Sequence, residues 1–145
     1  MTADDPRFSI PLTVRSDDLN FAQHVAHQNY FIYFQEARIA YLGQFGFSEL
    51  DICGCAMLIA EASCRYRREL FFGDRLQASC RVVRLTPKTF VMAYSLARDG
   101  VLCAEGSTTN LVVAPRQKKV VPLPDGFVAA VRAFEGRSLA APPGP

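Results

Sequence analysis

The stretch "HQNYFIYFQEARIAYLGQFGF", residues 27–47, decides the fold. Its apolar side chains recur with the period of an α-helix, at Tyr30, Phe34, Ala37, Tyr41 and Phe45. Phe31 and Leu42 widen this stripe, so the helix is apolar around much of its girth. We therefore expect other elements to wrap around it. Gly43 and Gly46 are its expected stop signals.

The segments on either side of the helix alternate between apolar and polar residues, which is typical of half-buried strands. Residues 8–14 show this pattern before the helix, and residues 57–70 and 75–85 show it afterwards. In residues 57–70, one face of the strand is predicted to carry Leu58, Ala60, Ala62, Cys64 and Tyr66. These strands are expected to pair in a mostly antiparallel sheet.

The rest of the chain completes a single domain. Residues 89–115 predict two strands joined at Asp99-Gly100, a strong hairpin signal. Asp125 is the expected N-cap of a short helix. The predicted fold class is α+β, with a curved antiparallel sheet wrapped around a central helix. The domain is expected to span residues 1–136, and residues 137–145 to form a mobile C-terminal tail.

Composition excludes several classes of protein. A chain of 145 residues, half of them apolar, fits one domain that buries roughly 70% of its unfolded surface. A net charge of +2 does not favour nucleic acid as a partner. The N-terminus lacks the apolar core of a secretory signal, and no apolar run approaches the ~20 residues of a membrane span. We therefore expect a cytoplasmic protein without a membrane partner.

The five cysteines do not predict disulfides or a metal site. They are Cys53, Cys55, Cys64, Cys80 and Cys103, an odd number without a Cys-x-x-Cys motif. His24 and His27 lie far from them in sequence, whereas a metal site requires closer clustering. We predict buried thiols and neither a metal nor a redox cofactor.

A series of polar residues precedes and enters the helix. It reads Asp18-Leu19-Asn20, Gln23-His24-Val25-Ala26-His27, Tyr30 and Glu36-Ala37-Arg38. This series resembles that of hotdog-fold acyl-CoA thioesterases of the 4-hydroxybenzoyl-CoA thioesterase type. Their members carry Asp-x-Asp, Gly-His-Val-Asn-Asn, Tyr and Glu-Ala-Arg. The similarity continues through Gly73-Asp74 and Pro122-Leu123-Pro124, and it implies a hotdog fold that hydrolyses an acyl thioester.

Asn20 departs from this pattern at the position that matters most for the chemistry. Thioester hydrolysis requires an attacking oxygen, a group that removes its proton or forms an acyl-enzyme, and a donor to the carbonyl oxygen. In the family, the second Asp of Asp-x-Asp acts as base or nucleophile. A neutral carboxamide cannot take up a proton near pH 7, although it can orient a water or polarise a carbonyl.

Three hypotheses follow. In the first, Asn20 orients water or the carbonyl while Tyr30 and Arg38 help to stabilise the oxyanion. This arrangement is similar to the acyl-carrier-protein thioesterases of enediyne biosynthesis. In the second, the missing acid is replaced by another group, which is Asp18, His24 or Glu36. In the third, the domain binds acyl-CoA without cleaving it.

Each candidate also has a structural interpretation. Asp18 could cap a turn, and His24 could be a hydrogen-bonded loop residue. Tyr30 could belong to the core, and Arg38 could be an ion-pair partner. Phe21, Phe31 and residues near Met57 are expected to line an apolar acyl pocket.

The resemblance implies a coenzyme A or acyl-carrier-protein thioester as substrate. Coenzyme A enters as part of the substrate, and its phosphates favour arginine and lysine at the mouth of a groove. The candidates form two basic groups, Arg65, Arg67 and Arg68, and Arg116, Lys118 and Lys119. Either group could instead be a solvated sheet edge. Relatives join their sheets edge to edge, so a homodimer or homotetramer is expected.

Overall fold

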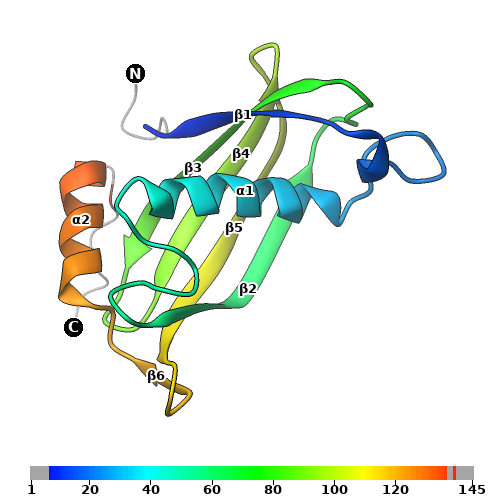
Figure 1. The fold of residues 1–145 in the computed structure, drawn as a ribbon. Coiled ribbons are helices and arrows are strands. Elements are labelled where there is room, and N and C mark those ends of the chain that lie inside the picture. The colour runs from blue at the N-terminus through cyan, green and yellow to red at the C-terminus, as the bar shows by residue number, and fades with distance from the viewer. Residues whose placement is uncertain (1–6, 137–138, 140–145) are drawn as a thin grey trace.

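A six-stranded antiparallel sheet curves around one long helix, α1 (Asn29–Gly43) (Figure 1). This computed structural model describes residues 7–136 and residue 139. The strands are β1 (Ser9–Thr13), β2 (Ala56–Tyr66), β3 (Arg75–Leu85), β4 (Phe90–Arg98), β5 (Val101–Ala114) and β6 (Lys119–Val121). They lie in the order β1-β3-β4-β5-β2, with β6 paired to β5. The predicted fold class and the central helix are confirmed.

The helix packs closely against the middle of the sheet. Phe34 stacks on Tyr94 of β4, with ring centroids 4.8 Å apart. A Cβ atom at position 106 of β5 would lie 2.6 Å from Cε2 of Phe34, closer than side chains approach one another. Gly106 therefore allows the helix to reach the sheet at this point. Helix α1 ends at Gly43, as predicted.

The predicted faces of β2 are wrong at its N-terminal end. Pairing with β5 shifts by one residue between Ile59 and Glu61, so a β-bulge interrupts the alternation. Ile59 pairs with Asn110 on the face toward α1, whereas Leu58 pairs with Leu111 on the opposite face. β2 is also an edge strand of the sheet, opposite to β1, and most of its residues are exposed.

The turn between β4 and β5 follows the prediction. Asp99 and Gly100 have φ angles of 53° and 77°, the conformation of a two-residue hairpin turn. Strand β6, which pairs with the end of β5, was not predicted from the sequence. It has three residues, too few for a periodic pattern.

A second helix, α2 (Asp125–Glu135), closes the end of the molecule where α1 finishes (Figure 1). The predicted N-cap is wrong by one residue, because Pro124 occupies that position and Asp125 is the first helical residue. Fully buried Glu135 ties α2 to the core by accepting hydrogen bonds from the Tyr41 hydroxyl and, at 3.0 Å, from the Val82 amide. In the described part of the chain, no helix has the length and hydropathy to cross a membrane. The expected mobile tail lies outside the described residues, except for Leu139.

The cysteine prediction holds only in part. All five cysteines are free thiols, and Cys80 and Cys103 are buried. Cys55 and Cys64 are half-buried. Cys53 is exposed because it occupies a tight turn with Gly54, so the prediction of burial is wrong for this residue.

Candidate active site

The loop that carries Asn20 and His24 lies at the N-terminal end of α1 (Figure 1). The Asn20 amide donates to the His24 carbonyl oxygen at 2.9 Å, and Leu19 bridges to Val25, so the loop folds back on itself. The Val25 amide then donates to the Leu70 carbonyl oxygen at 2.8 Å. These backbone bonds fix the loop beside the segment that follows β2.

A groove of about 290 Å³ opens between this loop, the first turn of α1 and the end of β2. Its polar lining includes Asn20, His24, Tyr30, Arg67, Arg68 and Glu69. The structure thus brings together three of the six candidate catalytic residues. Asp18, Glu36 and Arg38 do not line this groove.

Asn20 presents its amide nitrogen as an unused donor. Its Oδ1 accepts the Ala22 amide hydrogen at 2.9 Å, which fixes the orientation of the side chain. Its Nδ2 has no hydrogen-bond partner among the described residues, and the side chain is exposed. The arrangement supplies hydrogen-bond donors to an oxygen atom in the groove.

His24 lies between two oxygen atoms of the chain. Its Nδ1 lies 3.3 Å from the Val25 carbonyl oxygen, and its Nε2 lies 4.0 Å from Oε1 of Glu69. If Nδ1 carries the hydrogen, Nε2 is an acceptor beside a carboxylate. A neutral imidazole held in this way can accept a hydrogen bond from a water molecule in the groove.

Tyr30 forms the buried wall of the groove. Its hydroxyl donates to the Arg68 carbonyl oxygen at 3.4 Å, and its ring meets Tyr66 edge to face. Burial is the largest cause that raises the pKa of Tyr30 to about 12, so the phenol is neutral near pH 7. It can donate a hydrogen bond but cannot act as a base at that pH.

Asp18 has a structural position. Its Oδ2 accepts from the Tyr33 hydroxyl at 2.7 Å and from the Arg15 amide at 2.9 Å, while Oδ1 accepts from Nδ2 of Asn29 at 3.2 Å. Burial and then the hydrogen bond to Asp18 raise the pKa of Tyr33. The carboxylate therefore holds the loop against α1.

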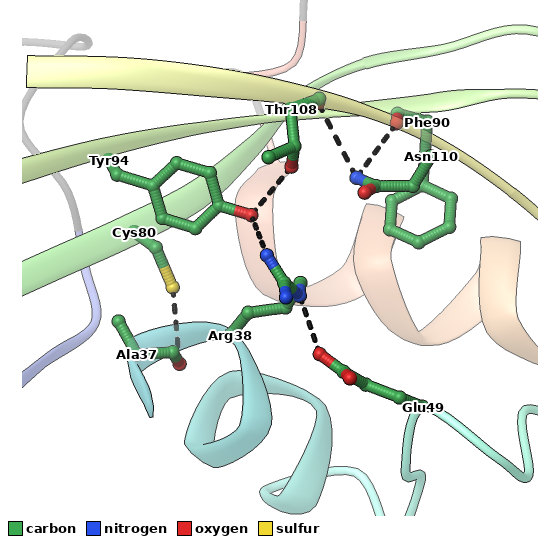
Figure 2. A network of polar contacts seen from close by, with 8 residues as sticks. All are labelled: Ala37, Arg38, Glu49, Cys80, Phe90, Tyr94, Thr108 and Asn110. Carbon is green, nitrogen blue, oxygen red and sulfur yellow. Dashed lines mark hydrogen bonds and ion pairs between the residues drawn. The ribbon is translucent and has the colours of Figure 1, made fainter. Parts of the chain in front are cut away.

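Arg38 lies deeper, in the middle of α1, where Figure 2 shows it between Glu49 and Tyr94. Its Nε donates to Glu49 at 2.6 Å and its Nη1 donates to the Tyr94 hydroxyl at 3.1 Å. Burial lowers the pKa of Arg38, but interactions with Tyr94 and Glu49 outweigh it and raise the pKa. Arg38 is thus a cation inside the domain, 3% exposed.

The basic residues are dispersed. Arg68 is exposed at the groove, and Arg67 pairs with Glu105 at 2.5 Å. Arg65 of β2 pairs with Glu105 of β5, and both residues lie on the sheet face away from α1. Lys118 occupies the turn before β6, a strand that lies far from the start of α1 (Figure 1).

The sequence model of the Thioesterase-like superfamily matches residues 14–131, which contain the groove and nearly the whole domain. The chain belongs to this superfamily. A relative from Aquifex aeolicus, named "Putative esterase", is 30% identical over 102 residues, which are 69% of this chain and 78% of the relative. The 1,4-dihydroxy-2-naphthoyl-CoA hydrolase of Microcystis aeruginosa is 31% identical over 89 residues, 59% of this chain and 64% of that enzyme.

Solved structures of thioesterases share the fold of this superfamily member. A thioesterase from Thermus thermophilus, crystallised with coenzyme A and Zn, superposes with a TM-score of 0.83 at 25% identity. The match covers 92% of this chain and 98% of that structure, so the predicted hotdog fold is confirmed. Within residues 7–136 and residue 139, no three His, Cys, Asp or Glu side chains gather closely enough to hold a metal.

Several residues in the groove beside Asn20 and around Arg38 were not recognised from the sequence. Glu69 and Tyr66 reach the groove because β2 ends beside the Asn20 loop. Glu49 reaches Arg38 from the segment after α1, and Tyr94 reaches it from β4. Of these residues, only Tyr94 had a signal in the sequence, because it follows the alternation of β4 that buries Phe90, Met92 and Leu96. Glu36 is exposed and does not line the groove.

Proposed function

We propose that this protein hydrolyses an acyl thioester of coenzyme A or of an acyl carrier protein, releasing a free acid and a thiol. In its finer form, the proposal is a thioesterase of the 4-hydroxybenzoyl-CoA thioesterase type in which Asn20 replaces the usual aspartate. Membership of the Thioesterase-like superfamily supports the reaction class. The groove at the N-terminal end of α1 supports the proposed location of the reaction.

One observation carries the proposed role of Asn20. Because Oδ1 is held by the Ala22 amide at 2.9 Å, this groove-lining side chain keeps its Nδ2 donors without a partner among the described residues. A fixed donor stabilises the negative charge that develops on a carbonyl oxygen during acyl transfer. Asn20 is therefore assigned to the thioester oxygen, and neutral Tyr30 can join it by turning its single O–H away from the Arg68 carbonyl oxygen.

His24 is the proposed base. Water attacks the thioester carbon while Nε2 of His24 takes one of its protons, and the tetrahedral oxyanion accepts hydrogen bonds from Asn20. Collapse of this intermediate breaks the carbon–sulfur bond, and the imidazolium returns the proton to the leaving thiolate. Glu69, 4.0 Å from Nε2, stabilises the cation between these steps.

Among the basic candidates, Arg68 is the proposed phosphate contact because it is exposed at the groove. Arg67 already pairs with Glu105 and contributes less. Arg65 and Lys118 lie away from the groove of their own chain, so their proposed contact with the carrier requires a second copy. The same side chains would suit the acidic surface of an acyl carrier protein.

A homodimer is the proposed minimal assembly, with a homotetramer as its extension. The outer edge of β2 has no strand beside it in the described chain. Exposed apolar side chains occur nearby on β2 and α1, namely Ile32, Ile39, Leu58 and Ile59. Sedimentation at micromolar concentration should give a dimer or tetramer. A fully active stable monomer contradicts this assembly.

Release of free thiol from short, long and aromatic acyl-CoA thioesters tests the reaction. The proposal expects turnover with at least one of them, measured beside the outer-face variant Ser95→Ala as a matched control. Tight binding without turnover on any coenzyme A or carrier-protein thioester would instead establish a non-catalytic acyl-CoA binding protein. This second candidate function is favoured by Asn20, because its neutral side chain cannot act as the usual carboxylate base.

A further inference from the structure

A second groove of about 190 Å³ runs between α1 and the edge strand β2. Its walls are mostly apolar and include Phe31, Phe34, Ile59 and Ala62. Arg38 and Thr108 also line it, although these two residues are only 3% and 2% exposed. The groove is therefore mostly apolar, and the polar groups of Arg38 and Thr108 lie at its base.

Arg38 retains unused hydrogen-bond donors at the base of this groove. A guanidinium carries five N–H groups, and Arg38 uses Nε for Glu49 and Nη1 for Tyr94. Its Nη2 has no hydrogen-bond partner within the described chain, yet it is not closed off as a buried orphan. Buried donors of native proteins find a partner in protein, water or ligand. These donors are available to an oxygen atom that enters the groove.

The charges of Arg38 and Glu49 determine which kind of ligand oxygen can bind here. Glu49 lies 2.6 Å from Arg38, so the cation already has its counter-ion. A second carboxylate in this poorly hydrated place would bring an unpaired negative charge and a large desolvation penalty. A hydroxyl or keto oxygen accepts the same hydrogen bond without that penalty. The cluster therefore favours a neutral acceptor.

The position of Arg38 sets how far this oxygen lies from the reacting carbonyl. Tyr30 lines the first groove and Arg38 the second, eight residues apart on one helix, which is roughly 12 Å along its axis. On β2, Tyr66 borders the first groove and Ala62, four residues earlier, borders the second. Both grooves thus follow the seam between α1 and β2.

We propose that the groove between α1 and β2 holds the far end of the acyl group, and that Arg38 there binds a neutral hydroxyl or keto oxygen. This inference rests on the proposed thioesterase function, since it specifies the substrate class of that site. Arg38 is then a specificity-determining residue rather than a donor to the thioester oxyanion.

Calorimetry with three non-hydrolysable coenzyme A thioethers tests the inference. The thioethers have equal chains spanning roughly 12 Å and end in methyl, hydroxyl or carboxylate. The hydroxyl chain should bind the wild-type protein about tenfold or more tightly than the methyl chain, the value of a hydrogen bond to a charged group. Arg38→Met should abolish this preference. Equal affinity for methyl and hydroxyl chains, or the tightest binding of the carboxylate chain, would overturn the inference.

A second variant protects the test if Arg38→Met does not fold. Ala62 is exposed on β2, so Ala62→Leu should fold and should narrow the groove beside its pairing partner Thr108, while the hydrogen bonds of Arg38 to Glu49 and Tyr94 are kept. It should weaken binding of both long chains while a two-carbon thioether binds as before. Unchanged binding of the long chains by Ala62→Leu would contradict the location of the subsite.

Thiol release in parallel separates the two proposals. Discrimination between the thioethers without hydrolysis of any thioester would overturn the proposed reaction and support the subsite. Hydrolysis without discrimination would support the reaction and overturn the subsite.

Discussion

The two grooves beside α1 use their polar atoms in opposite ways. At the N-terminal end, Asn20 and His24 are carried by a loop, are held through single local hydrogen bonds and keep one nitrogen each without a close partner. In the middle of the helix, Arg38 is held on two sides by Glu49 and Tyr94, and Tyr94 is itself hydrogen-bonded to Thr108.

This difference separates chemistry from recognition. A proton can move only through groups whose hydrogen bonds change during the reaction, which suits the loop. A donor that partners hold on two sides discriminates between ligands because it cannot rearrange to accept a poor one. We therefore expect substitutions in the first groove to change rate and substitutions in the second to change selectivity.

The largest expected effect is at His24. His24→Gln removes the proposed base while keeping a polar side chain of similar reach, and kcat should fall by about 10²–10⁴-fold. Lys88→Gln, on the distant β3–β4 turn, is the matched control and should retain the wild-type rate. A wild-type kcat for His24→Gln in a thiol-release assay would remove His24 from the mechanism.

A smaller effect is expected at Asp18, and it should be on stability. Asp18→Asn weakens the charge-assisted hydrogen bond from Tyr33, so the free energy of unfolding should fall by about 1.5–3 kcal/mol in urea titrations. Tyr33→Phe should have a similar effect, and the double variant should cost less than the sum. Loss of kcat by Asp18→Asn at unchanged stability would instead show that Asp18 is the replacement base.

The smallest expected effect is the pH dependence linked to Tyr30. Its pKa is about 12 in the folded protein and about 10 in an unfolded chain. Between these values the unfolded state loses its proton first, so stability falls as pH rises. Tyr30→Phe should show a shallower loss of unfolding free energy between pH 8 and pH 11 than the wild type. An equal loss in both proteins would mean that burial does not raise the pKa of Tyr30.

The sequence predicted the parts of the fold that local patterns encode. The apolar stripe of α1 and the turn at Asp99-Gly100 depend on neighbouring residues, and both are present. The bulge beside Ile59 and the short strand β6 depend on pairing with β5, a partner that periodicity does not identify. Long-range register is therefore where the prediction of β2 failed.

The candidate site shows the same division. Asn20, Tyr30 and Arg38 were grouped by resemblance, with His24 as an alternative base, and the loop brings Asn20, His24 and Tyr30 to one groove. Arg38 lies outside that groove, because eight residues of helix separate it from Tyr30 by roughly 12 Å. That spacing was readable before the structure. Its partners Glu49 and Tyr94 were not, because Glu49 comes from the segment after α1 and Tyr94 from β4.

Substitution of Asn20 tests the central claim most directly. If its Nδ2 donates to the thioester oxygen, Asn20→Ala should lower kcat by about 10²-fold or more while KM changes little, and Asn20→Asp should not exceed the wild-type rate. Both variants should be compared in one thiol-release assay with the best acyl-CoA substrate. A wild-type rate for Asn20→Ala, together with a large gain for Asn20→Asp, would show that the groove is a decayed aspartate-dependent site and would contradict this account.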